Sequence, residues 1–366
     1  MVDDLRDGAF LVLGDPLLGT NEIASALTGR GLGQRGMHTF DWNPGSAAAL
    51  TDINRRIEQQ GVAGLEPDPA LAAFARAHGT GAVAVVTHFC PVGRDLLSAL
   101  PNLRLVATVR AGTENIDLAA LDERDITLVA NPGRNANAVA ETTVGLMLAH
   151  LRRIATGHHR LLTNGWRDDP LEVERYRELT DKTVGLVGFG HVGRLVRRRL
   201  RGFDVRVLVY DPFLGPDEPA AHDVEAVSLD RLFAEADVVS LHARLSAETR
   251  NLLGPRELAL LKPTAIVVNT ARAELVDEAA LVDVLEGRRI MGAALDVFAT
   301  EPLPADHPFR RLDNVTLMPH VAGVSKEVFE GAAALLAARL DTMFRSPARS
   351  ASARPGQIAV GRTPPR

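Results

Sequence analysis

The chain has 366 residues, of which 46% are hydrophobic and 24% charged, and its formal net charge at pH 7 is −5. This slight acidity argues against nucleic-acid binding, which normally needs a basic face, and no apolar run approaches the roughly 20 residues of a membrane span. Cys90 is the single cysteine, which excludes an intrachain disulfide and a cysteine-based metal site, so we expect it in ordinary packing. The acidic N-terminus lacks the form of a signal peptide, which predicts a cytoplasmic protein.

The N-terminal part alternates between apolar strand patterns and helical patterns. A continuous apolar run such as Ala82–Thr87 is typical of a parallel strand that is buried on both faces. Strands that alternate with helices predict an α/β domain with a mostly parallel sheet. The expected elements, in chain order, are a strand at 10–14, a helix at 21–27, strands at 38–42 and 82–87, a helix at 94–100 and a strand at 103–109.

A glycine-rich turn follows a long helical pattern that runs from Ala138 to about Gly157 and could join two domains. Gly188, Gly190 and Gly193 have the spacing G-x-G-x-x-G between a β-branched run and a helical pattern. In a dinucleotide site the first glycine makes the tight turn, the second admits a pyrophosphate, and the third lets helix and strand pack closely. Asp211 ends the next apolar run, where such a fold places the carboxylate that binds a ribose 2′-OH.

The remainder of the chain continues the alternation, which predicts a doubly wound sheet. A last helix at about 326–344 leaves this unit and could pack on the first domain, making that domain discontinuous. The tail from 346 to 366 mixes Ser, Pro, Arg, Gly and Ala, so we expect disorder there. Strands are expected at 237–241, 265–269, 292–296 and 315–317, with helices at 229–236, 255–261 and 277–286.

Three of these strands run into groups that can carry chemistry, namely Arg272, Glu301 and His320. Ligands of open α/β sheets bind at the carboxyl ends of the strands. An arginine can hold a carboxylate in two hydrogen bonds and polarise the adjacent carbonyl, and a histidine can exchange the hydroxyl proton as a hydride moves. A carboxylate on the other ring nitrogen would raise the pKa of that histidine. Each residue alone also fits a structural role, but the three together with the glycine turn favour hydride transfer.

The chain resembles a D-2-hydroxyacid dehydrogenase of the group that includes D-3-phosphoglycerate dehydrogenase. The resemblance covers roughly residues 80–340, and residues 1–80 match only loosely. The segments that carry it are Arg110–Asp117, Asn131–Asn135 with Val139–Glu141, Lys182–Arg194, Asn269–Asp277, Leu295–Pro302 and Pro319–Gly323.

The resemblance implies a fold of two Rossmann-like domains with doubly wound parallel sheets. Residues 1–137 and 325–345 would form a flavodoxin-like substrate-binding domain, and residues 138–324 an NAD-binding Rossmann domain. The long helix of the second domain would contribute to a homodimer.

The resemblance also assigns roles by position. Arg272, Glu301 and His320 would form the catalytic triad, with Asp211 on the adenosine ribose. Backbone groups of Ala111 and Gly112 would hold the substrate carboxylate. The other residues implied near NAD are His191 and Val192 at the pyrophosphate, Thr270, Asp296 and Gly323 near the nicotinamide, His242 and Thr249 along the nucleotide, and Thr143 at the nicotinamide or the phosphates.

Several positions depart from the family pattern. Ala273-Glu274 stands where a glycine commonly follows the arginine, and Arg244 lies in the loop after His242, where it could touch a cofactor phosphate or be solvated. The Arg110 segment is shorter than in phosphoglycerate dehydrogenases, so the resemblance does not decide the substrate. Asp211 would repel a 2′-phosphate, and no arginine follows it to receive one, so the sequence predicts NAD rather than NADP.

The predicted function is NAD-dependent interconversion of a D-2-hydroxy acid and its 2-keto acid. Arg110 and His88 could hold a second anionic group of the substrate, such as a phosphate, phosphonate or carboxylate. The alternative is that Arg110 pairs with Glu114 or Glu141. Glu301 argues against a formate dehydrogenase, because formate enzymes resemble this chain but have glutamine at that position. Ala111 argues against a phosphite dehydrogenase, because phosphite enzymes have lysine at that position. An NAD-sensing binding protein of the corepressor type remains as an alternative.

Overall fold

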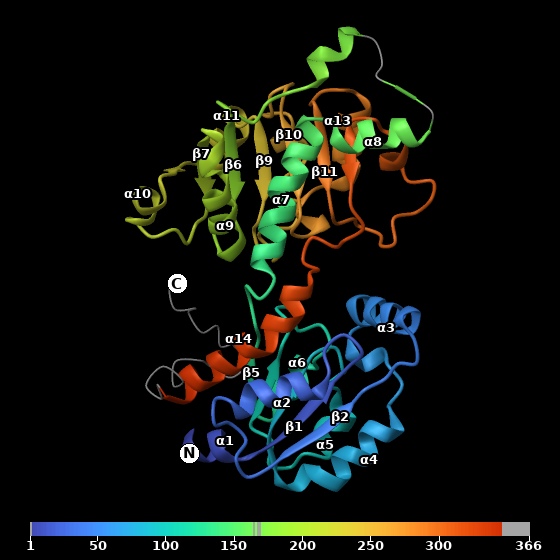
Figure 1. The fold of residues 1–366 in the computed structure, drawn as a ribbon, viewed down its shortest axis with the longest axis vertical. Coiled ribbons are helices and arrows are strands. Elements are labelled where there is room, and N and C mark those ends of the chain that lie inside the picture. Colours follow the sequence, from blue (N-terminus) through green and yellow to red (C-terminus); the bar gives the residue numbers. More distant parts are fainter. Residues whose placement is uncertain (1, 164, 167–169, 346–366) are drawn as a thin grey trace. The chain divides into compact units, whose positions relative to one another are not determined.

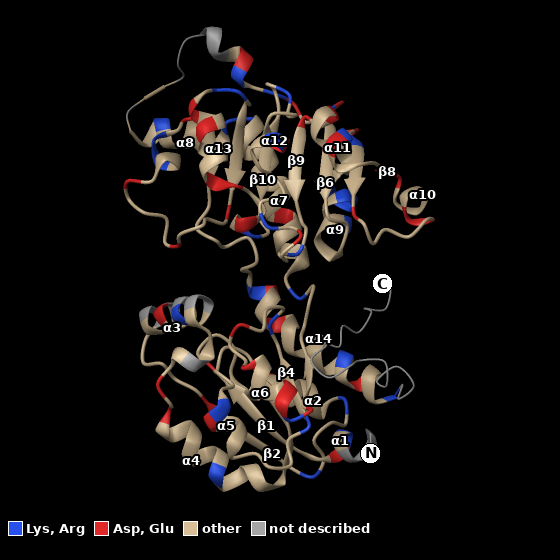
Figure 2. Ribbon diagram, turned by 180° about the vertical axis from the view of Figure 1, so that it is seen from behind, with Lys and Arg blue, Asp and Glu red and all other residues tan. Residues whose placement is uncertain are grey.

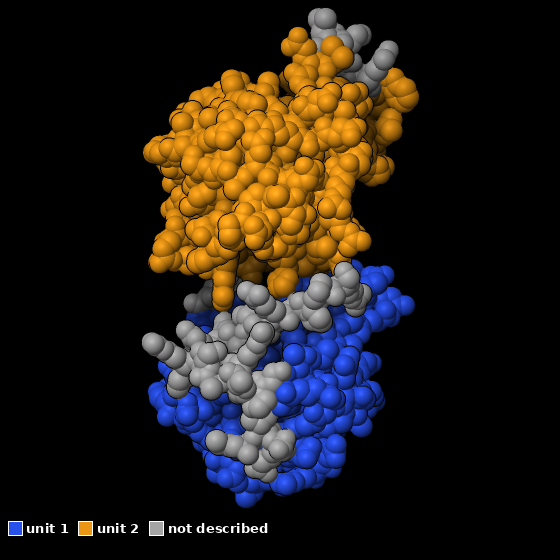
Figure 3. Space-filling view, turned by 90° about the vertical axis from the view of Figure 1, so that its left-hand side faces the viewer, with its two compact units in different colours: residues 1–134, 325–366 blue, residues 135–324 orange. Residues whose placement is uncertain are grey.

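The computed structural model describes residues 2–163, 165–166 and 170–345 (Figure 1). The disorder expected for 346–366 therefore falls outside the described residues. The chain divides into two compact units, which Figure 3 colours separately. Unit 1 comprises Met1–Arg134 and Ser325–Arg366, and unit 2 comprises Asn135–Val324.

Unit 1 is built on a five-stranded parallel sheet of order β2-β1-β3-β4-β5. Its strands are β1 (Ala9–Gly14), β2 (Met37–Asp41), β3 (Ala82–Thr87), β4 (Leu105–Thr108) and β5 (Thr127–Val129). Its helices are α1 (Val2–Asp7), α2 (Thr20–Thr28), α3 (Ala47–Gln60), α4 (Pro69–His78), α5 (Arg94–Ser98), α6 (Leu118–Glu123) and α14 (Lys326–Arg345), with 3-10 turns at Val62–Gly64 and Gly79–Gly81.

Helix α14 belongs to unit 1 although almost two hundred residues separate it from the rest of that unit. Leu336 and Leu340 of α14 pack in one buried cluster with Phe10 and Val12 of β1. The side-chain amide of Asn131 donates to the Ala332 carbonyl oxygen of the helix at 2.9 Å. Burying this apolar face therefore closes the sheet of unit 1 on one side.

Unit 2 contains a seven-stranded sheet of order β12-β11-β10-β9-β6-β7-β8, and its strand pairs are parallel. The strands are β6 (Thr183–Val187), β7 (Arg206–Tyr210), β8 (Glu225–Ala226), β9 (Val238–Leu241), β10 (Ile266–Asn269), β11 (Gly292–Leu295) and β12 (Val315–Leu317). The helices are α7 (Ala136–Leu151), α8 (Ile154–Leu162), α9 (His191–Leu200), α10 (Glu218–His222), α11 (Leu229–Glu235), α12 (Pro255–Leu258) and α13 (Glu278–Glu286), with 3-10 segments at Pro170–Arg175, Arg201–Phe203, Ala273–Leu275 and Pro308–Arg311.

The sheet of unit 2 is covered on both faces, which explains its uninterrupted apolar strands. In β10, Val267 packs in the cluster that contains Phe233 of α11, whereas Ile266 and Val268 pack in the cluster that contains Met147 of α7. Helix α7 crosses one face of the sheet in Figure 1. The alternation of side chains along one strand thus builds two cores.

The helix predicted at 138–157 was wrong in its length, because two helices occupy that stretch. Helix α7 ends at Leu151 and α8 begins at Ile154. Arg153 between them has φ 53°, a left-handed conformation that an α-helix cannot continue through. The apolar pattern runs across this break, so periodicity alone does not detect it.

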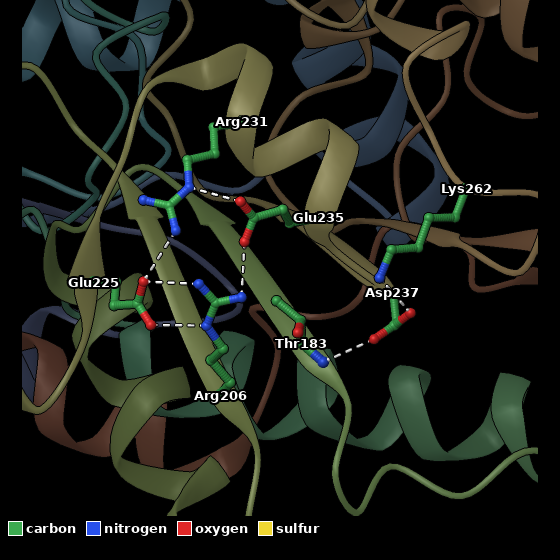
Figure 4. A network of polar contacts seen from close by, with 7 residues as sticks. All are labelled: Thr183, Arg206, Glu225, Arg231, Glu235, Asp237 and Lys262. Carbon is green, nitrogen blue, oxygen red and sulfur yellow. Dashed lines mark hydrogen bonds and ion pairs between the residues drawn. The ribbon is translucent and has the colours of Figure 1, made fainter.

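Charged side chains join the edge of the unit 2 sheet to a helix (Figure 4). Arg206 of β7 makes a two-bond contact with Glu225 of β8 and a third bond to Glu235 of α11. Arg231 bonds to both acids. These groups are half-exposed, so each pair contributes little, although the shared network holds the edge strand. Elsewhere, basic and acidic residues are interspersed over both units (Figure 2).

No helix within the described ranges is long and apolar enough to cross a membrane.

Candidate active site

The glycine turn joins β6 to α9, and two of its glycines are required by geometry. Gly188 has φ 95°, and a Cβ there would lie 2.6 Å from the Ala243 backbone nitrogen. A Cβ at Gly193 would overlap the carbonyl oxygen of Gly188. The first glycine therefore permits the turn, and the last permits the close approach of helix to turn.

Gly190 leaves open space in front of the helix. No atom outside its own neighbourhood lies within 4 Å of the position that a Cβ would take. Helix α9 begins at His191, and no side chain caps it at Gly190. The first-turn N–H groups of a helix attract an anion through their partial positive charge. The turn thus fits the pyrophosphate of a dinucleotide, with His191 and Val192 at the helix start.

Asp211 follows β7 and lies beside the glycine turn. Its Oδ2 accepts a hydrogen bond from the Phe189 backbone nitrogen at 2.7 Å, and its Oδ1 accepts one from Phe213 at 2.9 Å. Both oxygens are therefore held in one orientation next to the turn. Arg194, on the first turns of α9, pairs with Glu218 at 2.7 Å and lies over the Phe189 ring.

Arg272 follows β10 and is positioned by the last residue of that strand. The buried Asn269 donates from its amide nitrogen to the Arg272 carbonyl oxygen at 2.8 Å, and its amide oxygen accepts from the Ala271 nitrogen at 3.0 Å. The Arg272 side chain is exposed and donates to the Ala271 carbonyl oxygen. Sequence reasoning missed Asn269, although a polar residue that ends a buried apolar strand was a usable signal.

Glu301 and His320 form a hydrogen-bonded pair from two neighbouring strand ends. His320 Nδ1 lies 2.7 Å from Glu301 Oε2, and Glu301 Oε1 accepts from the Phe298 nitrogen at 2.9 Å. The bond to Glu301 raises the pKa of His320, against the effect of burial. Burial raises the pKa of Glu301, but its bonds to His320 and Phe298 outweigh this and hold it below its ordinary value. The pair thus favours an imidazolium beside a carboxylate.

The turn that carries His320 is fixed by Asp296. His320 has φ 54°, and the next two backbone nitrogens, of Val321 and Ala322, each donate to an Asp296 oxygen at 2.9 Å. Asp296 is buried, and this burial raises its pKa even though both hydrogen bonds lower it. Asp296, which follows β11, therefore supports the turn after β12.

Thr143 and Thr270 meet inside unit 2. The Oγ1 atoms lie 2.8 Å apart, and Thr143 also bonds to the Val139 carbonyl oxygen at 2.7 Å. Because Thr143 donates to that carbonyl, Thr270 is the donor between the two hydroxyls. Gly323 lies so close to the Asn135 side chain that a Cβ would overlap it.

His242 and Thr249 bond to nearby residues of their own segment. His242 Nε2 lies 2.9 Å from the Ser240 hydroxyl, and burial lowers the pKa of His242 to about 4, so the ring is neutral. Thr249 Oγ1 donates to the Arg244 carbonyl oxygen at 2.7 Å and accepts from the Ser246 nitrogen at 2.8 Å. Thr249 therefore braces the loop that carries Arg244.

Apart from Arg272, the predicted substrate contacts lie in unit 1. Arg110 lies over the Phe89 ring at 4.3 Å and faces Glu114 at 3.7 Å, which is one of the two pairings that the sequence left open. The other candidate, Glu141, belongs to unit 2 and pairs there with Arg199 of α9 at 2.7 Å. Gly112, which follows Ala111 in the Arg110–Asp117 segment, lies so close to the Glu114 carboxylate that a Cβ would overlap it.

His88 lies wholly inside unit 1. Its side chain has 0% exposed surface, and its Nδ1 bonds to Asp15 Oδ2 at 2.9 Å. Burial lowers the pKa of His88, with Asp15 opposing that effect. Its Nε2 is also buried and has no hydrogen-bond partner among the described residues.

A glycine turn with a carboxylate at the end of the next strand defines unit 2 as a dinucleotide-binding unit. Residues 144–322 match the NAD binding domain of the D-isomer specific 2-hydroxyacid dehydrogenases. The chain is 40% identical over 257 residues to a glyoxylate reductase of Thermofilum pendens, covering 69% of this chain and 76% of that protein. It is 37% identical over 284 residues to D-3-phosphoglycerate dehydrogenase of Mycobacterium tuberculosis, covering 78% of this chain and 52% of that protein.

Among solved structures, a 2-hydroxyacid dehydrogenase from Ketogulonicigenium vulgare aligns with TM-score 0.67 at 26% identity, covering 93% of this chain and 96% of that chain. The chain spans about half the length of the phosphoglycerate dehydrogenases that it matches. It belongs to the D-isomer specific 2-hydroxyacid dehydrogenase family of NAD-dependent oxidoreductases. The predicted family, α/β fold class and NAD cofactor are thereby confirmed.

Proposed function

We propose that this chain interconverts a D-2-hydroxy acid and its 2-keto acid, with Arg272, Glu301 and His320 as the catalytic residues. The observation that carries the proposal is the 2.7 Å contact between His320 Nδ1 and Glu301 Oε2. Glu301 follows β11, which lies next to β10, the strand that precedes Arg272. Arg272 also acts electrostatically on both members of the pair, because its charge lowers the pKa of each.

Each residue has a distinct task in this mechanism. Bound NADH supplies the hydride for reduction of the keto acid. Arg272 binds the substrate carboxylate and polarises the neighbouring carbonyl oxygen. His320 donates the proton from Nε2 to that oxygen as charge develops there, and it accepts the proton in the reverse direction. Glu301 holds Nδ1 protonated and stabilises the imidazolium.

Unit 2 would bind NAD, and unit 1 would provide further substrate contacts. The pyrophosphate would lie at Gly188, Gly190 and Gly193 with the helix start at His191 and Val192. Backbone N–H groups of Ala111 and Gly112 would hold the substrate carboxylate. The other residues proposed to line NAD are Asp211, Thr143, Thr270, His242, Thr249, Asp296 and Gly323.

Asp211 is proposed to set the preference for NADH over NADPH. Its charge would bind ribose hydroxyls and repel a 2′-phosphate. Asp211→Asn keeps an acceptor for the turn but removes the charge, so the ratio of kcat/KM for NADH to that for NADPH should fall about tenfold, equivalent to roughly 1.4 kcal/mol. Steady-state kinetics with both cofactors measure this ratio. A wild-type enzyme that prefers NADPH would contradict the proposal.

Substrate identity is open to a direct test. NADH oxidation would be followed with glyoxylate, hydroxypyruvate, phosphohydroxypyruvate, phosphonopyruvate and 2-oxoglutarate. We expect turnover of several 2-keto acids, and a preference for members that carry a second anionic group would support a role for Arg110. Saturable NADH binding without turnover of any keto acid would instead favour the NAD-sensing binding protein.

The homodimer and the cytoplasmic location stay predictions. The segment after α7 supports the first, because Leu161, Leu162 and Trp166 are exposed on it. Apolar side chains clustered at a surface mark interaction sites more often than scattered ones do.

A further inference from the structure

The carboxyl edge of the unit 1 sheet gathers charged groups from four adjacent strands. Asp15 follows β1, His88 follows β3, Arg110 follows β4, and Arg134 lies beyond β5. Ligands of open α/β sheets bind at this edge. The same edge of unit 2 carries Arg272 and the pair of Glu301 and His320.

Arg134 has donors that the protein leaves unused. Its Nε and Nη1 atoms are buried and have no hydrogen-bond partner among the residues that the structure describes. Burial and the neighbouring charge of Arg110 lower the pKa of Arg134 to about 10, so it is still charged at neutral pH. Arg134 is half-buried, and leaving two buried donors of a cation unpaired is costly unless an acceptor completes the site.

The carboxylates nearby do not supply that acceptor. Asp15 Oδ1 accepts hydrogen bonds from two backbone N–H groups. Asp15 Oδ2 is hydrogen-bonded to His88 Nδ1 and to a third backbone N–H group. Glu114 faces Arg110 at 3.7 Å, which is longer than a hydrogen bond. Glu114 Oε2 is buried and, like the two nitrogens of Arg134, has no hydrogen-bond partner among the described residues, so neither acid bonds to these nitrogens.

His88 is a second side chain with a buried nitrogen that lacks a hydrogen-bond partner among the described residues. Its Nδ1 is engaged by Asp15, while Nε2 is buried without a partner. The charges of Arg134 and Arg110 both act on this ring. An anion placed near them would favour the imidazolium, whose Nε2 then becomes a donor. Among the described residues, Arg134 and His88 therefore leave three buried nitrogens without a hydrogen-bond partner, and Arg110 acts electrostatically on both side chains.

We propose that Arg134, with Arg110 and His88, binds an oxyanion of the phosphate, phosphonate or carboxylate class. The guanidinium fork suits such a group, because it can make two parallel hydrogen bonds. The assignment of this oxyanion to the substrate rests on the proposed function. A free anion would use the same contacts, and the two sources are separated by experiment.

The first test is calorimetric titration of the full chain with inorganic phosphate, in the absence of any keto acid. Wild-type protein should bind phosphate saturably, and Arg134→Met should weaken the binding at least about tenfold. Arg134→Lys, which keeps the charge, should give an intermediate affinity and guards against a folding defect. Arg76→Met, on the exposed face of α4, serves as the matched control and should bind phosphate like the wild type.

The second test compares kcat/KM for phosphohydroxypyruvate with that for glyoxylate, which has no second anionic group. Arg134→Met should lower the ratio at least about tenfold while glyoxylate turnover changes little. If phosphate binding depends on Arg134 but the ratio does not, the site takes a free anion. The site is overturned if wild-type protein does not bind phosphate and Arg134→Met leaves the kcat/KM ratio unchanged. It is also overturned if Arg134→Met lowers kcat/KM equally for both substrates. Phosphate binding without turnover of any keto acid overturns the proposed function only.

Discussion

Replacing His320 with asparagine is expected to lower kcat by about 10²- to 10⁴-fold, the usual contribution of a positioned general acid. Asparagine suits this position because His320 has φ 54°, a conformation that asparagine tolerates better than alanine. The affinity for NADH, measured by fluorescence titration, should change by no more than about twofold, since the loss is one of proton transfer. A kcat close to that of the wild type would remove His320 from the mechanism.

The pH dependence of kcat/KM tests the pair of His320 and Glu301. A general structural defect would lower kcat/KM without shifting the midpoint of this dependence. Reduction needs protonated His320, whose pKa is raised by Glu301. The kcat/KM for the keto acid should therefore be high at low pH and fall as the pH rises through that raised pKa. Glu301→Gln removes the charge, so the midpoint should move to lower pH. Glu286→Gln on α13 is the control, and its profile should match the wild type.

Replacing Arg272 with lysine is expected to lower kcat/KM by about 10²- to 10³-fold, the loss typical of removing one donor to a developing oxyanion. Lysine keeps the positive charge but not the planar fork that binds a carboxylate in two bonds. Because Asn269 holds the Arg272 backbone rather than its side chain, the loop should keep its conformation.

Arg256→Lys on α12 is the control for the Arg272 variant. Arg256 is an exposed arginine that makes two bonds to Asp230, so the change in kcat/KM should stay within about twofold. Partial rescue of an Arg272→Ala variant by free guanidinium would support the role of the fork. Equal kcat/KM for Arg272→Lys and wild type would exclude it.

Several features were predictable from the sequence because they depend on local chemistry. The three glycines were recognised by spacing, since a tight turn and a close helix contact each exclude a side chain within a few residues. The apolar strands of unit 2 were found because strands buried on both faces have continuous apolar runs. Helix α3, the separate α8 and the short β5 were harder to detect, since their signals are weak or run across a break such as Arg153.

Pairings between distant segments needed the fold. The sequence left Arg110 with Glu114 or Glu141, and the fold places Arg110 3.7 Å from Glu114 and Glu141 2.7 Å from Arg199 of α9. The bond between Thr143 and Thr270 joins residues 127 positions apart. No local pattern indicated Arg134, because whether its donors are paired depends on the positions of all the side chains around it in the folded chain.

The sequence by itself determined the family, the NAD cofactor and the residues that stand at the strand ends of unit 2. These follow from short motifs whose chemistry is complete within one turn or one strand. Only the tertiary structure decided how those residues are held, with His320 on Glu301 and its turn on Asp296. The physical reason is that hydrogen bonding and burial depend on distances between segments that the chain brings together only when it folds.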